Sequence, residues 1–200
     1  MITFTERLDK ALRIAAWAHD KQGQYRRVSN VPFIVHPFGV MTIASQATDD
    51  EDILIGALLH DVLEDVDEKI YSEADMLRDF GPRVVGLVKD VSHNAAITDW
   101  HERNNDYLRH LEFDADKDAL IISAADKINN LQSTITDYGQ LGEELWQTFR
   151  TKNVADQFWW YGAVLAVLEK RAPELSLNAV LKQNIEKLRQ VRAAHGVIED

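Results

Sequence analysis

A helix is predicted over residues 53–65, which read Ile53-Leu54-Ile55-Gly56-Ala57-Leu58-Leu59-His60-Asp61-Val62-Leu63-Glu64-Asp65. At about 100° per residue, the branched apolar side chains cover more than half of its circumference. Such a helix is buried on most sides. The remaining sector of roughly 140° is apolar or small at its start and carries His60, Asp61, Glu64 and Asp65 at its end.

These four polar side chains indicate a functional site. Burying three carboxylates and an imidazole together is costly unless a positive charge compensates them. A divalent cation is the simplest compensating charge. The ordinary alternative is a solvated helix end, but acids are favoured at the start of a helix, and Glu64 and Asp65 lie at its end.

Two further polar positions fit the same site. Residues 119–131 also predict a mostly buried helix, and Ser123, Asp126 and Asn130 form a polar stripe on it at i, i+3 and i+7. A structural aspartate with a hydrogen-bond partner is the alternative for Asp126. His36 precedes Pro37 at the start of another predicted helix, where a half-buried or capping histidine would be ordinary.

The rest of the chain is also helical in pattern. Ser72 begins a short helix with a capping-box pattern that Gly81-Pro82 ends, and Thr48 or Asp49 is expected to cap the 53–65 helix. The sequence therefore predicts an all-α fold, a compact multi-helix bundle forming one domain over 1–200, with a core at about 8–168 and a C-terminal helix at about 174–194. The other predicted helices cover about 5–22, 37–47, 98–113, 116–132, 143–171 and 174–194.

Composition excludes several classes of function. Lys and Arg total 22 against 33 Asp and Glu, and the net charge of -11 argues against non-specific nucleic-acid binding. The absence of cysteine excludes disulfides, thiolate nucleophiles and cysteine-type zinc sites, so a metal must use His, Asp or Glu. No apolar run approaches the roughly 20 residues of a membrane span, and the N-terminus has no secretory pattern. We expect a cytoplasmic protein without membrane or nucleic-acid partners.

Three segments carry a resemblance to a known family. They are Pro32-Phe33-Ile34-Val35-His36-Pro37, Ala57 to Asp65 (ALLHDVLED), and Ala125 to Leu131 (ADKINNL). They resemble the PYI-x-HP, ALLHD-x-x-ED and ADK-x-x-NL segments of the RelA/SpoT-type hydrolase domain, which is an HD-domain metal-dependent phosphohydrolase. The resemblance runs from about residue 8 to about 168. It is to the small alarmone hydrolases, the branch without a synthetase domain.

The resemblance implies a metal site and a reaction. It implies a single Mn²⁺ held by His36, His60, Asp61 and Asp126, with Glu64 and Asp65 activating or orienting the attacking water. Two imidazoles and two carboxylates also suit Fe²⁺ or Zn²⁺. The implied reaction is hydrolytic removal of the 3′-pyrophosphate from guanosine tetra- or pentaphosphate, which gives GDP or GTP and pyrophosphate.

The segments expected to contact the substrate match the family pattern less closely than the metal site does. By the same resemblance, the candidates for the nucleotide substrate are Arg26, Arg27, Arg103, Lys127 and Asn130. Several neighbours depart from the family pattern: Phe33 stands where Tyr is usual, Asn104 where Lys is usual, Asn129 where an aromatic residue is common, Gln132 where Arg is usual, and Ser92-His93-Asn94 replaces a more acidic stretch. The departures leave the base of the alarmone open, as guanine (ppGpp) or adenine (ppApp).

Two other functions stay open from the sequence. One is an HD-domain phosphohydrolase of another nucleotide, such as a dNTP or a nucleoside monophosphate. The other is a nucleotide sensor without catalysis.

The aromatic residues between Trp146 and Tyr161 are expected on one long helix as core or oligomer contacts, which leaves a homo-oligomer open. The remaining histidines share no ligand spacing and are expected to be non-functional: His19, His93, His101, His110 and His195.

Overall fold

The computed structural model describes residues 3–196, and every helix or strand element in that range is helical. This confirms the all-α fold class. The elements are α1 (Glu6–Lys21), α2 (Val35–Ala44), α3 (Glu51–Leu59), α4 (Val62–Asp65), α5 (Glu73–Phe80), α6 (Pro82–Asp90), α7 (Trp100–Phe113), α8 (Ala119–Leu141), the 3₁₀ helix η1 (Gly142–Thr148), α9 (Val154–Arg171) and α10 (Leu177–Ala194).

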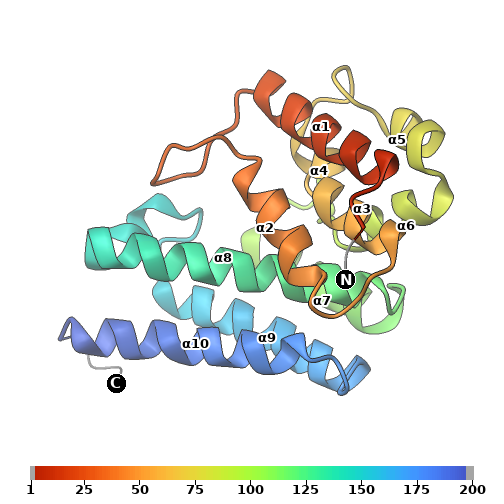
Figure 1. The fold of residues 1–200 in the computed structure, drawn as a ribbon. Coiled ribbons are helices and arrows are strands. Elements are labelled where there is room, and N and C mark those ends of the chain that lie inside the picture. The colour runs from red at the N-terminus through yellow and green to blue at the C-terminus, as the bar shows by residue number, and fades with distance from the viewer. Residues whose placement is uncertain (1–2, 197–200) are drawn as a thin grey trace.

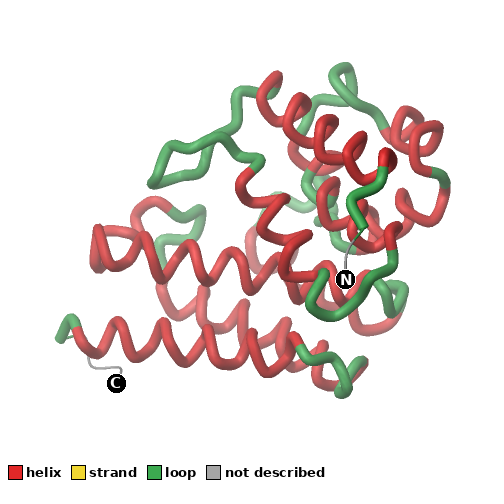
Figure 2. Tube along the Cα trace, viewed as in Figure 1, coloured by secondary structure: helices red, strands yellow, loops and turns green. Residues whose placement is uncertain are grey.

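Helix α8 forms the centre of the molecule. Figure 1 shows it crossing the middle of the bundle, with α2 and α3 on one side and α9 and α10 on the other. It packs against all four of these helices. The long loop between α1 and α2, residues 22–34, is seen in Figure 2 as a green excursion beside the bundle. An isolated bridge between Tyr25 and Pro32 pins the arms of this loop together.

Helix α3 is buried along its whole apolar run. Each of residues 53–59 is buried, as its sequence pattern predicts. Gly56 lets this helix approach α8 closely, because a Cβ atom there would come 2.8 Å from Cδ1 of Ile122. The close packing sets the end of α3, and therefore His60, against the middle of α8.

Polar caps fix where several helices begin. Thr5 accepts a hydrogen bond from the N–H of Leu8, and Ser72 forms a complete capping box with Asp75. The cap of α3 was expected at Thr48 or Asp49, and this expectation is wrong. Asp50 is the cap, because its carboxylate reaches the first free N–H groups of α3.

The helix predicted over 53–65 is broken at His60 and Asp61. Helix α3 ends at Leu59, and the separate short helix α4 begins at Val62. The physical reason is local: Nδ1 of His60 bonds to the carbonyl oxygen of Ala57 at 2.9 Å. A continuous α-helix would use that carbonyl for the N–H of residue 61.

Two other boundaries differ from expectation. Helix α8 continues nine residues beyond the predicted end at 132, and within this extension the hydroxyl groups of Thr134 and Thr136 bond back to carbonyls one turn earlier instead of competing for the helix backbone elsewhere. The helix predicted over 143–171 is two elements. Gly142, at φ +55°, leads into η1, and Asn153 caps a new helix, α9. The remaining predicted bounds lie within about three residues of the observed ones.

None of the helices between residues 3 and 196 is both long and apolar enough to cross a membrane.

Candidate active site

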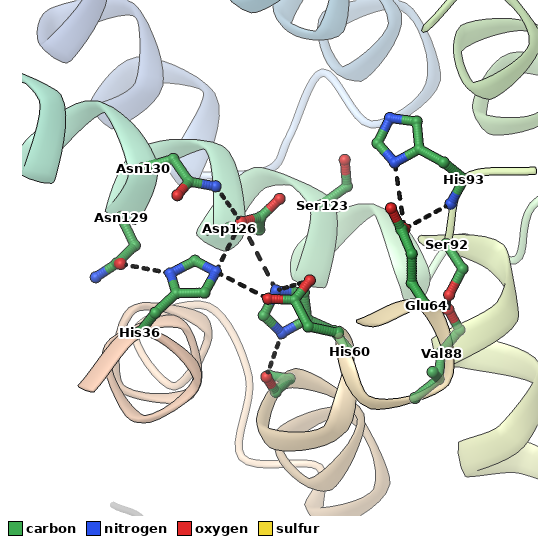
Figure 3. Close-up of polar contacts among 12 residues, drawn as sticks. His36, His60, Glu64, Val88, Ser92, His93, Ser123, Asp126, Asn129 and Asn130 are labelled. Carbon is green, nitrogen blue, oxygen red and sulfur yellow. Dashed lines mark hydrogen bonds and ion pairs between the residues drawn. The ribbon is translucent and has the colours of Figure 1, made fainter. Parts of the chain in front are cut away.

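Three buried side chains from three helices converge at the centre of the molecule. His36 comes from the first turn of α2, His60 from the end of α3 and Asp126 from the middle of α8 (Figure 3). One ligand atom from each lies within 4.8 Å of the others. Nε2 of His36 is 3.3 Å from Oδ1 of Asp126, and Nε2 of His60 is 3.7 Å from the same oxygen. This donor set is a candidate site for a divalent metal ion.

Asp61 lies beside the same centre. Its two carboxylate oxygens are 3.1 Å from Nε2 of His60 and 3.3 Å from Nε2 of His36. Burial alone would lower the pKa of both imidazoles, but the carboxylates of Asp61 and Asp126 raise the pKa of each. The centre therefore stabilises positive charge, which is the electrostatic property that a metal site needs.

Nδ1 of each of these two histidines already has a hydrogen-bond partner within the protein. Nδ1 of His36 donates to Oδ1 of Asn129 at 2.7 Å, and Nδ1 of His60 donates to the carbonyl of Ala57 (Figure 3). Each imidazole thus turns Nε2 to the centre. Nε2 of His60 is buried and makes no hydrogen bond to any residue in the range 3–196. A buried imidazole nitrogen that faces two carboxylates without forming a hydrogen bond fits a metal ligand, since a ligating histidine holds its other N–H in a bond such as that to Ala57.

A glycine on the neighbouring helix makes room for Asn129. A Cβ atom on Gly39 of α2 would come 2.3 Å from Nδ2 of Asn129, which is closer than real Cβ atoms approach. Asn129 can therefore sit against α2 and reach His36 only because residue 39 is glycine. The sequence showed Asn129 as a departure from the family pattern, and the structure gives it a contact with His36.

Asp126 is held on both oxygens. Nζ of Lys127 lies 2.5 Å from Oδ2, and Nδ2 of Asn130 donates to Oδ1 at 2.6 Å. Burial would raise the pKa of the Asp126 carboxyl, but the Lys127 ammonium and both imidazoles hold it well below its usual range. Lys127 itself is buried, 5.1 Å from the ring centroid of Tyr107 and 5.2 Å from that of Trp160. Asp126 is therefore a fixed carboxylate.

Glu64 lies at a second polar cluster near the centre. Its carboxylate pairs with the guanidinium of Arg103 and accepts a hydrogen bond of 2.8 Å from the backbone N–H of His93. The ring of His93 also approaches Glu64, with Nδ1 at 3.3 Å, and turns Nε2 to Asn104 at 3.2 Å. Burial would raise the pKa of Glu64, but the bonds from His93 lower it, so Glu64 is ionised at neutral pH.

Asp65 has a different setting from Glu64. The residue is exposed at the end of α4 and does not line the cavity described below. Its backbone carbonyl accepts a hydrogen bond from the side chain of Gln24 at 3.2 Å. Partial desolvation of the carboxyl, together with the charges of Asp61 and Glu64, raises the pKa of Asp65 to about 7.

A cavity of about 450 Å³ opens beside these residues. The loop between α1 and α2, and helices α7, α8 and α9, supply most of its wall. All five residues expected to contact substrate line it: Arg26, Arg27, Arg103, Lys127 and Asn130. Arg103 and Lys127 are already paired with carboxylates. Arg26 and Arg27 form no ion pair with any residue between 3 and 196, and the guanidinium of Arg27 lies 4.3 Å from the ring centroid of Phe149.

Sequence reasoning missed two groups of cavity residues. His93, expected to be non-functional, lies in the wall and binds Glu64. Its only sequence signal was its place in the stretch that departs from the family pattern. The aromatic residues between Trp146 and Tyr161 were assigned to one helix, which is wrong. The break before α9 brings Phe149, Trp160 and Tyr161 to the cavity from two separate segments.

The HD domain family profile matches residues 11–153, most of the chain. Over 125 residues the chain is 34% identical to guanosine-3′,5′-bis(diphosphate) 3′-pyrophosphohydrolase MESH1 of Drosophila melanogaster, a match that covers 62% of this chain and 66% of that protein. It is 28% identical over 131 residues to a guanosine-3′,5′-bis(diphosphate) 3′-pyrophosphohydrolase of Aquifex aeolicus, covering 65% of this chain but 18% of that protein. The chain thus matches only a part of the length of these curated relatives.

The fold agrees with this match. A solved structure of a metazoan orthologue of SpoT that hydrolyses ppGpp is similar, with a TM-score of 0.72 at 26% identity, over 99% of this chain and 100% of that one. The fold is that of an HD-domain hydrolase, and it brings together the His36, His60 and Asp126 cluster, a candidate site for a divalent ion. The chain belongs to the HD domain family.

Proposed function

We propose that this protein is a metal-dependent hydrolase that removes the 3′-pyrophosphate of a guanosine 3′,5′-bis(diphosphate)-type alarmone. The observation that supports this most strongly is the buried cluster of His36, His60 and Asp126 beside a cavity lined by arginines that form no ion pair in the described part of the chain. The relatives named above carry that activity in their names. The proposed products are a nucleoside diphosphate or triphosphate and pyrophosphate.

The proposed resident cofactor is Mn²⁺, held by His36, His60, Asp61 and Asp126. The donor set of imidazoles and carboxylates supports it, although Fe²⁺ and Zn²⁺ suit the same donors. A divalent ion held there would supply Lewis acidity, to lower the pKa of a water molecule and offset charge on a phosphoryl oxygen. Lys127 and Asn130 hold Asp126 in place for this role, and Asn129 holds His36.

Glu64 is proposed to orient the attacking water. Its carboxylate is ionised and fixed by Arg103 and His93, so it offers a positioned hydrogen-bond acceptor. Asp65, with a pKa of about 7, is proposed as a second group that accepts a proton near neutral pH. In the reaction, water adds to phosphorus while the bond from phosphorus to the ribose 3′ oxygen breaks, and that oxygen leaves with a proton.

Arg26 and Arg27 are proposed to bind the phosphates. Neither forms an ion pair with a carboxylate in the described part of the chain, so their charges are available to a polyanion. Arg150, which also lines the cavity, bonds instead to the backbone carbonyl of Thr98. The net charge of -11 would otherwise repel such a substrate. The pocket thus offers a polyanion arginine side chains that are not already neutralised by carboxylates of the protein.

Product analysis tests this proposal. Protein stripped of metal is reloaded with Mn²⁺, Fe²⁺ or Zn²⁺ and given ppGpp, ppApp, a set of dNTPs and nucleoside monophosphates. We expect pyrophosphate release from an alarmone, lost on stripping and restored best by Mn²⁺. Turnover of only a dNTP or a monophosphate would keep the metal site and overturn the substrate. Binding without any turnover would favour the sensor.

Two wider expectations go with this proposal. We propose that the chain forms one domain, since α10 packs against α8 and α9. Residues 1–2 and 197–200 of the expected domain lie outside the described residues. A cytoplasmic location, which the sequence favours, and a homo-oligomer both stay predictions.

A further inference from the structure

Asp137 is an anomaly in the cavity. It lies on α8 and lines the pocket together with three other carboxylates, Asp61, Glu64 and Asp126, each of which is paired with a histidine, arginine or lysine side chain. Its side chain makes no hydrogen bond and no ion pair with any residue in the range 3–196. Burial raises the pKa of the Asp137 carboxyl, while the charges of Arg26 and Arg27 oppose that rise. A carboxylate repels phosphates, which favours a contact between Asp137 and an uncharged part of the ligand beside the phosphates that Arg26 and Arg27 are proposed to bind.

The position of Asp137 along α8 places it away from the metal centre. Eleven residues separate it from Asp126, which corresponds to about 16 Å along a helix axis. Both residues line the same cavity, and so does Asn130 between them. A nucleotide with its 3′-diphosphate at the centre would extend its nucleoside along α8 toward Asp137.

A second unused polar group lies in the same wall. Gln157 of α9 is 6% exposed, lines the cavity and makes no side-chain hydrogen bond with the described residues. Figure 1 shows α9 running opposite to α8, and Trp160 of α9 lies over Lys127. Gln157 is one turn before Trp160, so it lies on the Asp137 side of Lys127. Its amide is therefore available to bond to a ligand in the cavity.

We propose that Asp137 reads the base of the substrate and selects guanine over adenine. The Watson–Crick edge of guanine presents two adjacent donors, N1–H and the 2-amino group, which match the two oxygens of a carboxylate. Adenine presents an acceptor, N1, beside its 6-amino group, and this acceptor would repel Asp137. Bidentate recognition of a base edge discriminates by about tenfold or more. The inference rests on the proposed function for the identity of the nucleotide.

Binding of nucleoside diphosphates tests this inference without turnover. Isothermal titration of the Mn²⁺-loaded protein with GDP, IDP and ADP compares three bases that differ at the edge. Wild type is expected to bind GDP about tenfold more tightly than ADP, with IDP weaker than GDP because it lacks the 2-amino group. D137N is expected to lose the preference for GDP or to favour ADP, since an amide can donate to adenine N1 and accept from its 6-amino group.

The variant D20N controls for the loss of one negative charge from the protein. D20N makes the same change on an exposed residue of α1 that does not line the cavity. It should leave the GDP to ADP ratio unchanged. If D137N merely strengthened binding of all three nucleotides by the same factor, Asp137 would be acting on the phosphates through its charge, and the inference would be overturned.

The remaining outcomes separate the two proposals. Equal affinities of wild type for GDP and ADP, or no detectable GDP binding, overturn the role of Asp137 whether or not ppGpp is hydrolysed. A guanine preference that depends on Asp137 supports that role even if ppGpp is not a substrate. In that case the proposed reaction is rejected, while the role of Asp137 in recognising the base is supported.

Discussion

The two ends of the cavity are built differently. At the metal end, every key group has a partner within the protein: His36 bonds to Asn129, His60 to the carbonyl of Ala57 and Asp126 to Lys127. At the other end, Asp137 and Gln157 have no hydrogen-bond partner among the described residues. The first arrangement suits a permanent ion, and the second suits a ligand that arrives and leaves.

The largest expected effect comes from breaking the pair at the metal end. D126A leaves the Lys127 ammonium buried without its carboxylate, which should lower the free energy of unfolding by about 3–5 kcal/mol. Urea unfolding of metal-free protein measures this. The double variant D126A/K127M should recover most of the loss, because it removes the stranded charge. A D126A protein as stable as wild type would show that the pair carries no such constraint.

Replacing Glu64 should separate chemistry from metal binding. E64Q keeps the size of the side chain but removes its charge, so kcat is expected to fall by about 100-fold or more. Metal content, measured by elemental analysis, should stay at the wild-type level. E102Q makes the same change next to Arg103 on an exposed position and should keep full activity. Full activity of E64Q would rule out the proposed role in orienting water.

A pair of glycine substitutions tests how the metal end is held. G39A places a methyl group against Asn129 and should disturb its bond to His36, lowering metal affinity by about 10- to 100-fold. G86A is the matched control, since a Cβ atom at Gly86 of α6 meets nothing within 4 Å. G86A should keep metal affinity and gain about 1 kcal/mol of stability from helix propensity. Competition with a chelating dye measures both affinities.

The smallest expected effect is on the pH dependence of stability, because Asp65 is exposed and solvent screens the interactions of its carboxyl. The pKa of Asp65 is raised to about 7 in the folded protein and is about 3.9 in the unfolded chain. Between these values the folded state holds the extra proton, so stability falls as pH rises from about 4 to about 7. D65N should therefore be more stable than wild type at pH 8 and equal to it near pH 4. Urea midpoints of the metal-free proteins at both pH values measure the difference. The same offset at both pH values would contradict this titration.

Local signals made much of the fold predictable from the sequence. The capping box at Ser72 and the Gly81-Pro82 boundary set α5 and α6 within a few residues in sequence, and the buried stripe of α3 needs no partner to be recognised. The break at His60 was missed, because it depends on a side chain taking a backbone acceptor. The length of α8 was missed because hydroxyl groups that favour loops instead bonded within the helix.

The candidate site also contains some residues that local sequence reveals and others that only the packing of helices brings together. His60, Asp61 and Glu64 are close in sequence and stand out as charges on an apolar helix. The bond from His36 to Asn129 joins positions 93 residues apart, and only the packing of α2 on α8 brings them together. His93 and Asp137 are ordinary surface-type residues in a linear sequence. Their significance depends on the cavity wall, which forms only after the helices pack.

The salt bridge between Asp126 and Lys127 has a consequence for how the protein matures. The lysine is the next residue in the chain, so the aspartate has a counter-charge from the moment α8 forms. Assembly of the bundle does not have to wait for an ion from the surroundings. We therefore expect the metal-free protein to fold, so that metal loading can be a late step on a finished scaffold.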